Sequence, residues 1–120
     1  MTIFRKIFAF TTQEISCIFK HAGAKKYHTG LKLLQAPVNC SPIIQSAKNP
    51  YGKLLIVTPR ACGKAHDRNR IRRQIKAIFY EEELYQAPAI WVLLVRKQAM
   101  DLSFDDLKKF LVNTIHGNHS

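Results

Sequence analysis

Acidic side chains are scarce in this 120-residue chain: 8 Asp and Glu stand against 19 Lys and Arg, a formal net charge of +11 at pH 7. This excess is more than solubility needs, and it favours a polyanionic partner. Long apolar runs are also lacking, because the longest, Ala89 to Val95, falls far short of the roughly 20 residues of a membrane-spanning helix. The composition therefore excludes membrane insertion, while the 47% of hydrophobic residues excludes a disordered chain.

Cysteine pairs suited to a disulfide framework or a metal site are missing as well. Cys17, Cys40 and Cys62 are odd in number, widely spaced and without a CxxC pair. We expect them to be buried thiols in a reducing compartment, not disulfides or zinc ligands. The apolar and basic N-terminus turns polar at Thr11, before the apolar core of a signal peptide could form. These features predict a cytoplasmic protein.

Residue patterns for self-contained catalysis are few. No Gly-rich phosphate loop and no Ser/His/Asp arrangement is evident. His66 precedes Asp67, but adjacency in sequence alone does not make a proton-transfer pair. His116 and His119 form an HxxH pair that needs further ligands to hold a metal. We expect no catalytic side chain, and no metal or other cofactor bound by the protein alone.

The order of elements predicts an α+β fold. The length allows one domain, expected to span residues 1–120. Thr11 and Glu14 have the spacing of a capping box, and Lys25 and Lys26 are expected in a basic loop. The expected elements are a helix over 12–22, a strand that begins over 31–34 and ends near Pro37, and a strand over 54–57. A basic helix from Asp67, a strand over 89–95 and a helix from 103 to 117 follow, and a proline-containing loop is expected over 37–50. This order predicts a small α-β sandwich with one β-α-β crossover, right-handed by the general rule.

The basic helix has two distinct sides. Asp67 is expected to cap it, and four apolar residues recur at helical spacing on one face: Ile71, Ile75, Ile78 and Phe79. At about 100° per residue, a second stripe lies roughly a right angle or more away. That stripe consists of Asn69, Arg72, Arg73 and Lys76. The helix should therefore bury one side and present a basic side.

The basic stretch from Arg60 to Lys76 contains five Arg, two Lys and one acid, Asp67. A basic helix face is often only a solvated face. Here, however, acidic partners four residues away are absent, so the charges repel one another until an external anion relieves them. Arginine also suits bidentate contact with phosphate oxygens. The sequence therefore predicts nucleic-acid binding.

RNA is the better candidate than DNA. The basic helix lies between two strands and is not displayed by a helix-turn-helix, as entry into a DNA major groove requires. Sheet-and-helix domains with exposed aromatic residues more often bind RNA, by shape and stacking. Phe19 and Tyr27 are candidate stacking groups. For Phe19, packing of the first helix onto the sheet remains an equal alternative.

The residues from 63 to 73 read Gly-Lys-Ala-His-Asp-Arg-Asn-Arg-Ile-Arg-Arg. This string resembles the RNR motif of the protein component of bacterial ribonuclease P, in which G-x-A-x-x-R-N-R-(I/V)-(K/R)-R follows a strand. The resemblance covers about residues 11–115. It implies the fold order α-β-β-β-α-β-α, with an uncommon left-handed crossover around the basic helix.

The family resemblance also implies a function. Such a protein is the subunit of a ribonucleoprotein endonuclease that removes 5′ leaders from precursor tRNA. The RNA is the catalyst and uses Mg²⁺. Its expected partners are the catalytic RNA and precursor tRNA, with no membrane and no DNA. The alternative is a non-catalytic RNA-binding protein, such as a ribosome-associated factor.

Carried over by position, two groups of residues acquire roles. Phe19 matches an aromatic residue of the leader cleft between the first helix and the sheet, whereas Ile15 stands where the family has a second aromatic. Thr58, Pro59 and Arg60 replace the usual S-K-K and lose one positive charge. The expected contacts with the catalytic RNA are Arg68, Asn69, Arg70, Arg72 and Arg73, assisted by Arg60, Lys64 and Lys76.

Overall fold

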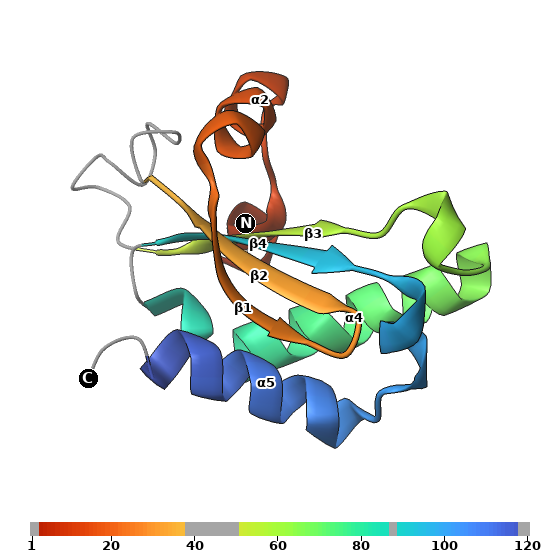
Figure 1. Ribbon diagram of the computed structural model, residues 1–120. Helices are drawn as coiled ribbons and strands as arrows, with labels where there is room; N and C mark the ends of the chain where they lie inside the picture. Colours follow the sequence, from red (N-terminus) through yellow and green to blue (C-terminus); the bar gives the residue numbers. More distant parts are fainter. Residues whose placement is uncertain (1–2, 38–50, 87–88, 118–120) are drawn as a thin grey trace.

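A four-stranded sheet lies between helices in the computed structural model, which describes residues 3–37, 51–86 and 89–117 (Figure 1). The helices are α1 (Ile3–Phe8), α2 (Thr12–His21), α4 (Ala65–Glu81) and α5 (Phe104–Gly117). The strands are β1 (Gly23–His28), β2 (Leu31–Ala36), β3 (Lys53–Val57) and β4 (Ile90–Val95). The described residues also form the short 3-10 helices η2 (Arg60–Cys62), η3 (Leu84–Gln86) and η4 (Lys97–Asp101). The predicted α+β class is confirmed.

The strand order is β1-β2-β4-β3, so β4 occupies an inner position. It pairs antiparallel with β2 and parallel with β3. Because α4 connects β3 to β4, the predicted β-α-β crossover is present, and its handedness stays a prediction. The uninterrupted apolar sequence of β4 follows from this position, since a strand covered on both faces has no polar side.

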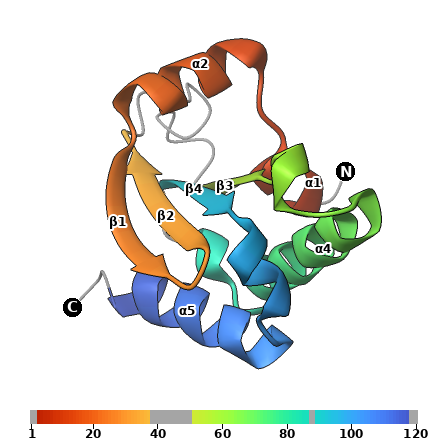
Figure 2. The same cartoon turned by 45° about the vertical axis from the view of Figure 1, so that its right-hand side comes forward.

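Helices cover both faces of the sheet: α4 and α5 lie on one face and α2 lies on the other (Figures 1 and 2). Successive side chains of a strand point to opposite faces. Trp91 and Leu93 of β4 therefore belong to the core under α4 and α5, whereas Ile90 and Val92 belong to a smaller core under α2. The sheet is the middle of three layers.

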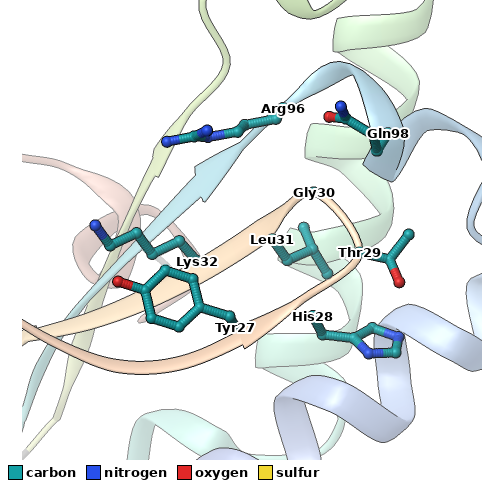
Figure 3. Close-up of a pocket in the computed structure, with 8 residues that line it drawn as sticks. All are labelled: Tyr27, His28, Thr29, Gly30, Leu31, Lys32, Arg96 and Gln98. Carbon is teal, nitrogen blue, oxygen red and sulfur yellow. The ribbon is translucent and has the colours of Figure 1, made fainter.

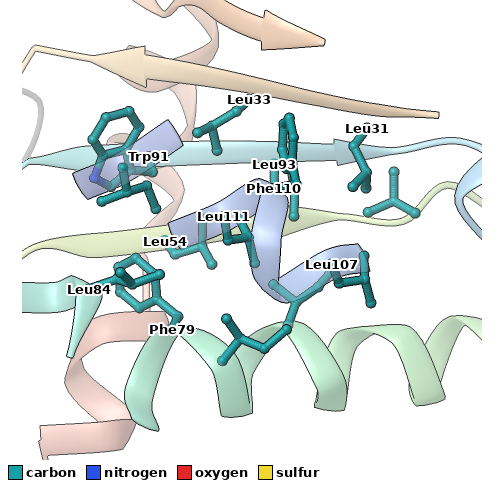
Figure 4. Close-up of a cluster of buried hydrophobic side chains, with 14 of the residues drawn as sticks. Leu31, Leu33, Leu54, Phe79, Leu84, Trp91, Leu93, Leu107, Phe110 and Leu111 are labelled. Atoms are coloured by element: carbon teal, nitrogen blue, oxygen red, sulfur yellow. The ribbon is translucent and has the colours of Figure 1, made fainter. Parts of the chain in front are cut away.

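The larger core joins the sheet to α4 and α5 (Figure 4). From α4 it receives the four residues of the predicted apolar face, Ile71, Ile75, Ile78 and Phe79, all of which are buried. From α5 it receives Leu107, Phe110, Leu111 and Ile115. The prediction that the basic helix buries one side is therefore confirmed, and α5 packs into the same core.

Three local predictions differ from the structure. Lys25 and Lys26 lie in β1, not in a loop; β1 is one of the three strands before α4 that the family resemblance implies, but its own sequence has no apolar alternation. The N-terminal residues form α1, whose Ile7 is fully buried in the larger core. Lys64, not Asp67, is the N-cap of α4, because Gly63 ends η2 and the helix begins immediately after it. The predicted loop over 37–50 lies outside the described residues, apart from Pro37.

The cysteines also differ from expectation. Cys62 is a free, buried thiol, as predicted. Cys17 is half-buried and disulfide-bonded, so the prediction of a buried thiol is wrong for this residue. A disulfide needs two Cβ atoms about 4 Å apart, and sequence spacing does not reveal such proximity. Cys40 lies outside the described residues.

Candidate nucleic-acid interface

The start of α4 is fixed to the segments around it by two of its arginines. Arg68 donates from Nε to the carbonyl oxygen of Gly63 at 3.2 Å. Arg70 donates from Nη2 to the carbonyl oxygen of Met100, in η4, also at 3.2 Å. These bonds connect the first turns of α4 to Gly63, which follows η2, and to η4. The first turns of α4 are therefore held in place by side chains of the RNR motif itself.

The predicted stripe lies on one side of α4. Asn69, Arg72, Arg73 and Lys76, together with His66, line a surface hollow of about 640 Å³. Arg72 is held in position, because it donates to Thr58 Oγ1 at 3.2 Å and to Asn69 Oδ1. Arg73 is exposed and has no ion pair within the described part of the chain. The hollow thus combines fixed and adaptable cations on one surface.

Asp67 relieves part of the expected charge repulsion. Its carboxylate lies 3.5 Å from Nη1 of Arg70, an ion pair between residues three apart. The prediction rested on the absence of partners four residues away and did not include this pair. Both side chains are more than a third exposed, 41% and 36%, so water screens the pair and it contributes little. Arg70 does not line the hollow, so this acid leaves the positive charge of the stripe uncompensated.

The remaining predicted contacts lie at the N-terminal end of this surface. Arg60 belongs to η2 and Lys64 caps α4, and both are exposed. The structure therefore places all eight predicted residues between η2 and the fourth turn of α4, but not in one cluster. Four share the hollow, two bind backbone carbonyls of other segments, and two extend the surface toward the helix start.

Helix α2 is positioned by its N-terminus and by a buried ion pair. Thr11 Oγ1 accepts from the Glu14 backbone N–H at 3.1 Å, and Glu14 Oε1 accepts from that of Thr11 at 2.8 Å, which confirms the capping box. Glu14 Oε2 also lies 3.4 Å from Lys53 Nζ of β3, and both side chains are only 5% exposed. The Lys53 ammonium lies 4.4 Å from the centre of the Phe10 ring. The sequence did not predict the role of Lys53, because it is 39 residues from Glu14 and the two side chains meet only in the folded chain.

Ile15 and Phe19 lie one turn apart on α2. Ile15 is half-buried, whereas Phe19 is 54% exposed. Phe19 is therefore not a core residue that merely packs the helix onto the sheet. Beside the buried residues under α2, the sheet presents partly buried apolar side chains on the same face: Leu34, Leu55, Val57 and Leu94. The sheet face under α2 is thus apolar, and Phe19 lies exposed on the helix that covers it.

Three other expectations concern metals, membranes and DNA. In residues 3–37, 51–86 and 89–117, no group of three His, Cys, Asp or Glu side chains could hold a metal ion. The side chain of His116 and the whole of His119 lie outside the description. No helix in the described ranges is long and apolar enough to cross a membrane. Helix α4 buries a whole face between β3 and β4, so it is not a freely displayed recognition helix.

Comparison with known proteins identifies relatives over nearly the whole chain. A family model described as Ribonuclease P matches residues 5–117. The "Ribonuclease P protein component" of Onion yellows phytoplasma (strain OY-M) is 28% identical over 109 residues, which cover 90% of this chain and 71% of the relative. That of Phytoplasma australiense is 35% identical over 74 residues, covering 58% of this chain and 64% of the relative.

Solved structures share the fold. The RNase P protein of Staphylococcus aureus superposes with a TM-score of 0.72 at 14% identity, covering 93% of this chain and 94% of that protein. The RNase P protein of Thermotoga maritima gives a TM-score of 0.69 at 20% identity, covering 90% of this chain and 94% of that protein. At such identities the likeness concerns the arrangement of elements alone.

Proposed function

Because the chain belongs to the ribonuclease P protein family, we propose that it assists a catalytic RNA in removing 5′ leaders from precursor tRNA. The family makes it a protein subunit of ribonuclease P, which acts in tRNA processing with an RNA partner. The proposal assigns cleavage to that RNA and its Mg²⁺ ions, and to no side chain of the protein. It also places the complex in the cytoplasm.

The cationic hollow on α4 is the observation that carries this proposal. Arg72, Arg73 and Lys76 line it beside Asn69 and His66, with no acidic residue among the lining side chains. Phosphate oxygens are the natural ligands of such a surface, because each contact releases counterions from the RNA. We assign the hollow to the catalytic RNA. Arg60 and Lys64 extend the contact, and Arg68, Asn69 and Arg70 hold the helix start and the neighbouring guanidinium in place.

The leader is assigned to the α2 side of the sheet, opposite α4 and α5. Phe19 offers an exposed ring on which an unpaired base can stack. Ile15 offers only apolar contact, so α2 should bind the leader less strongly than a helix with aromatic residues at both positions. With the leader on one face and the catalytic RNA on α4, the protein's net charge of +11 offsets repulsion between two RNAs that must approach each other.

Cleavage of precursor tRNA by the matching catalytic RNA, with and without this protein, tests the proposal. We expect strong stimulation at low Mg²⁺ and a correct 5′ end. The stimulation should shrink as Mg²⁺ rises, because the metal then screens the RNA charges that the protein offsets. If the protein bound that RNA but left cleavage unchanged at every Mg²⁺ concentration, a general RNA-binding role would replace the proposal.

Phe19→Ala should weaken binding of precursor tRNA by roughly tenfold and leave binding of mature tRNA nearly unchanged. The estimate follows from base–aromatic stacking, worth about 1–3 kcal/mol per base. Folding should hardly change, because the ring is already 54% exposed. Equilibrium binding of both tRNA forms to the assembled ribonucleoprotein measures the difference. Gln13→Ala, at an exposed position on the other side of α2, is the control, and equal losses for both tRNA forms would refute the leader contact.

A further inference from the structure

A second surface hollow lies at the end of the β1–β2 hairpin, away from α4. It measures about 370 Å³. Three of its side chains come from different strands or strand ends: Tyr27 from β1, Lys32 from β2 and Arg96 from the residue after β4. They point to the same side of the sheet, whereas His28 points toward α5 (Figure 3), where it stacks on Phe110.

The backbone around this hollow is rigidly held. Tyr27 and Lys32 are direct partners in the β1–β2 ladder. Gly30 in the connecting turn has a φ of 79°, and a Cβ there would lie 2.4 Å from the backbone nitrogen of Ala99. The Arg96 backbone N–H donates to the carbonyl oxygen of Gly30 at 2.8 Å. The hairpin and the end of β4 are therefore joined, which fixes the backbone positions from which the three side chains project.

The chemistry of the hollow suits a nucleotide. The ring of Tyr27 is 65% exposed although it stands on an ordered strand, and the Lys32 ammonium lies 5.2 Å from its centre. Arg96 is exposed, and no acidic side chain lines the hollow. An exposed aromatic ring beside two cations is the combination that binds unpaired nucleic acid, because bases stack on the ring and phosphates pair with the cations.

This hollow lies on the sheet face that also carries α2. Lys32 pairs with Leu94 across the β2–β4 ladder, and Leu94 packs against the smaller core under α2. Residues paired across a ladder share a face. On β2, Lys32 lies four residues from Ala36, which contacts that core, and the separation is about 13 Å at roughly 3.3 Å per residue. An RNA strand that crosses the sheet face from α2 along β2 would reach Tyr27 within a few nucleotides.

We propose that Tyr27, Lys32 and Arg96 form a binding subsite for one nucleotide of single-stranded RNA, distinct from the contact at Phe19. Tyr27 stacks on the base, while Lys32 and Arg96 bind the adjoining phosphates. Within the proposed function, this nucleotide belongs to the precursor leader, beyond the part held beside α2. The protein then senses leader length, because only a leader that spans the face fills both positions.

Direct binding of a labelled, unstructured oligoribonucleotide to the full-length protein tests the subsite itself. Tyr27→Ala should weaken binding about tenfold, Tyr27→Phe should retain it, and Arg96→Gln should weaken it and reduce its salt dependence. The matched charge control is Lys97→Gln, at the next residue, which is exposed and does not line the hollow. Unchanged affinity in Tyr27→Ala, or equal losses in Arg96→Gln and Lys97→Gln, would overturn the subsite.

A leader-length series with the assembled ribonucleoprotein tests its use. Leaders are lengthened one nucleotide at a time, and precursor affinity is compared between the natural protein and Tyr27→Ala. The two should bind short leaders equally and diverge about tenfold once the leader reaches the hollow. Equal affinity at every length would overturn the leader assignment, even where the oligonucleotide experiment supports the subsite. Absence of any stimulation by the natural protein would instead contradict the proposed function, and the oligonucleotide result would still decide the subsite.

Discussion

Replacing Lys53 by methionine is expected to lower the free energy of unfolding by about 3–5 kcal/mol, the usual range for breaking a buried ion pair by removing one partner. The Lys53 and Glu14 side chains are each only 5% exposed. Methionine fills a similar volume but leaves the Glu14 carboxylate in a site that water hardly reaches. Since this pair joins α2 to β3, the loss should also loosen the helix that carries Phe19.

Denaturant unfolding of the single and double variants measures this effect. The double variant Lys53→Met with Glu14→Gln should lose less unfolding free energy than the sum of the two single losses. Each single variant leaves one buried charge without its partner, whereas the double variant leaves none. Lys97→Met removes an exposed lysine and should change the unfolding free energy by less than about 0.5 kcal/mol. A loss below about 1 kcal/mol for Lys53→Met would show that water solvates the pair.

Removing three charges from α4 and its N-cap should weaken binding of the catalytic RNA by about 100-fold or more. The variant combines Lys64→Gln, Arg73→Gln and Lys76→Gln and lowers the net charge from +11 to +8. None of the three donates a hydrogen bond among the bonds found in the described chain, so the fold should persist. With about six phosphate contacts, the natural protein should show a slope of log K against log salt of roughly −4 to −5. In the variant this slope should be less negative by about 2.

A second triple variant separates location from total charge. Lys26→Gln, Lys97→Gln and Lys109→Gln also lower the net charge to +8 and change exposed residues away from α4. If the hollow on α4 is the interface, these changes should cost far less affinity than the first set. Equal losses would mean that the RNA responds only to net charge. Arg70 is left intact in both sets because it binds the Met100 carbonyl, so its removal would disturb η4 as well.

The sequence revealed those elements whose pattern reflects local rules. The capping-box spacing of Thr11 and Glu14 predicted the start of α2. The spacing of the apolar residues in α4 predicted which face is buried and which carries the basic stripe. The uninterrupted apolar run from Ile90 to Val95 predicted an inner strand. Each of these signals lies within a few residues of chain, which is why the structure agrees with them.

Elements defined by distant partners could not be found in this way. β1 is an edge strand held by backbone pairing to β2, with an irregularity between Ala24 and Lys26, so its side chains need no apolar alternation. The N-cap of α4 moved to Lys64 because η2 and Gly63 determine where the helix begins.

The candidate site was predictable only in part for the same reason. Helical geometry alone grouped Asn69, Arg72, Arg73 and Lys76. It could not show that Arg68 and Arg70 bind carbonyl oxygens outside α4. Met100, for example, is 30 residues from Arg70 in sequence and comes close to it only in the folded chain. The hollow at Tyr27 likewise depends on three separate strands meeting.

The pairing of β2 with β4 has a consequence for the order in which the chain is made. Leu33 of β2 pairs with Leu93 of β4, so β2 and β3 are synthesised long before the strand that joins them emerges from the ribosome. Until then, β2 and β3 each retain an unpaired inner edge, the kind of edge that invites association between chains. Contacts so distant in sequence also slow folding. The nascent protein therefore completes its sheet only after β4 has been synthesised.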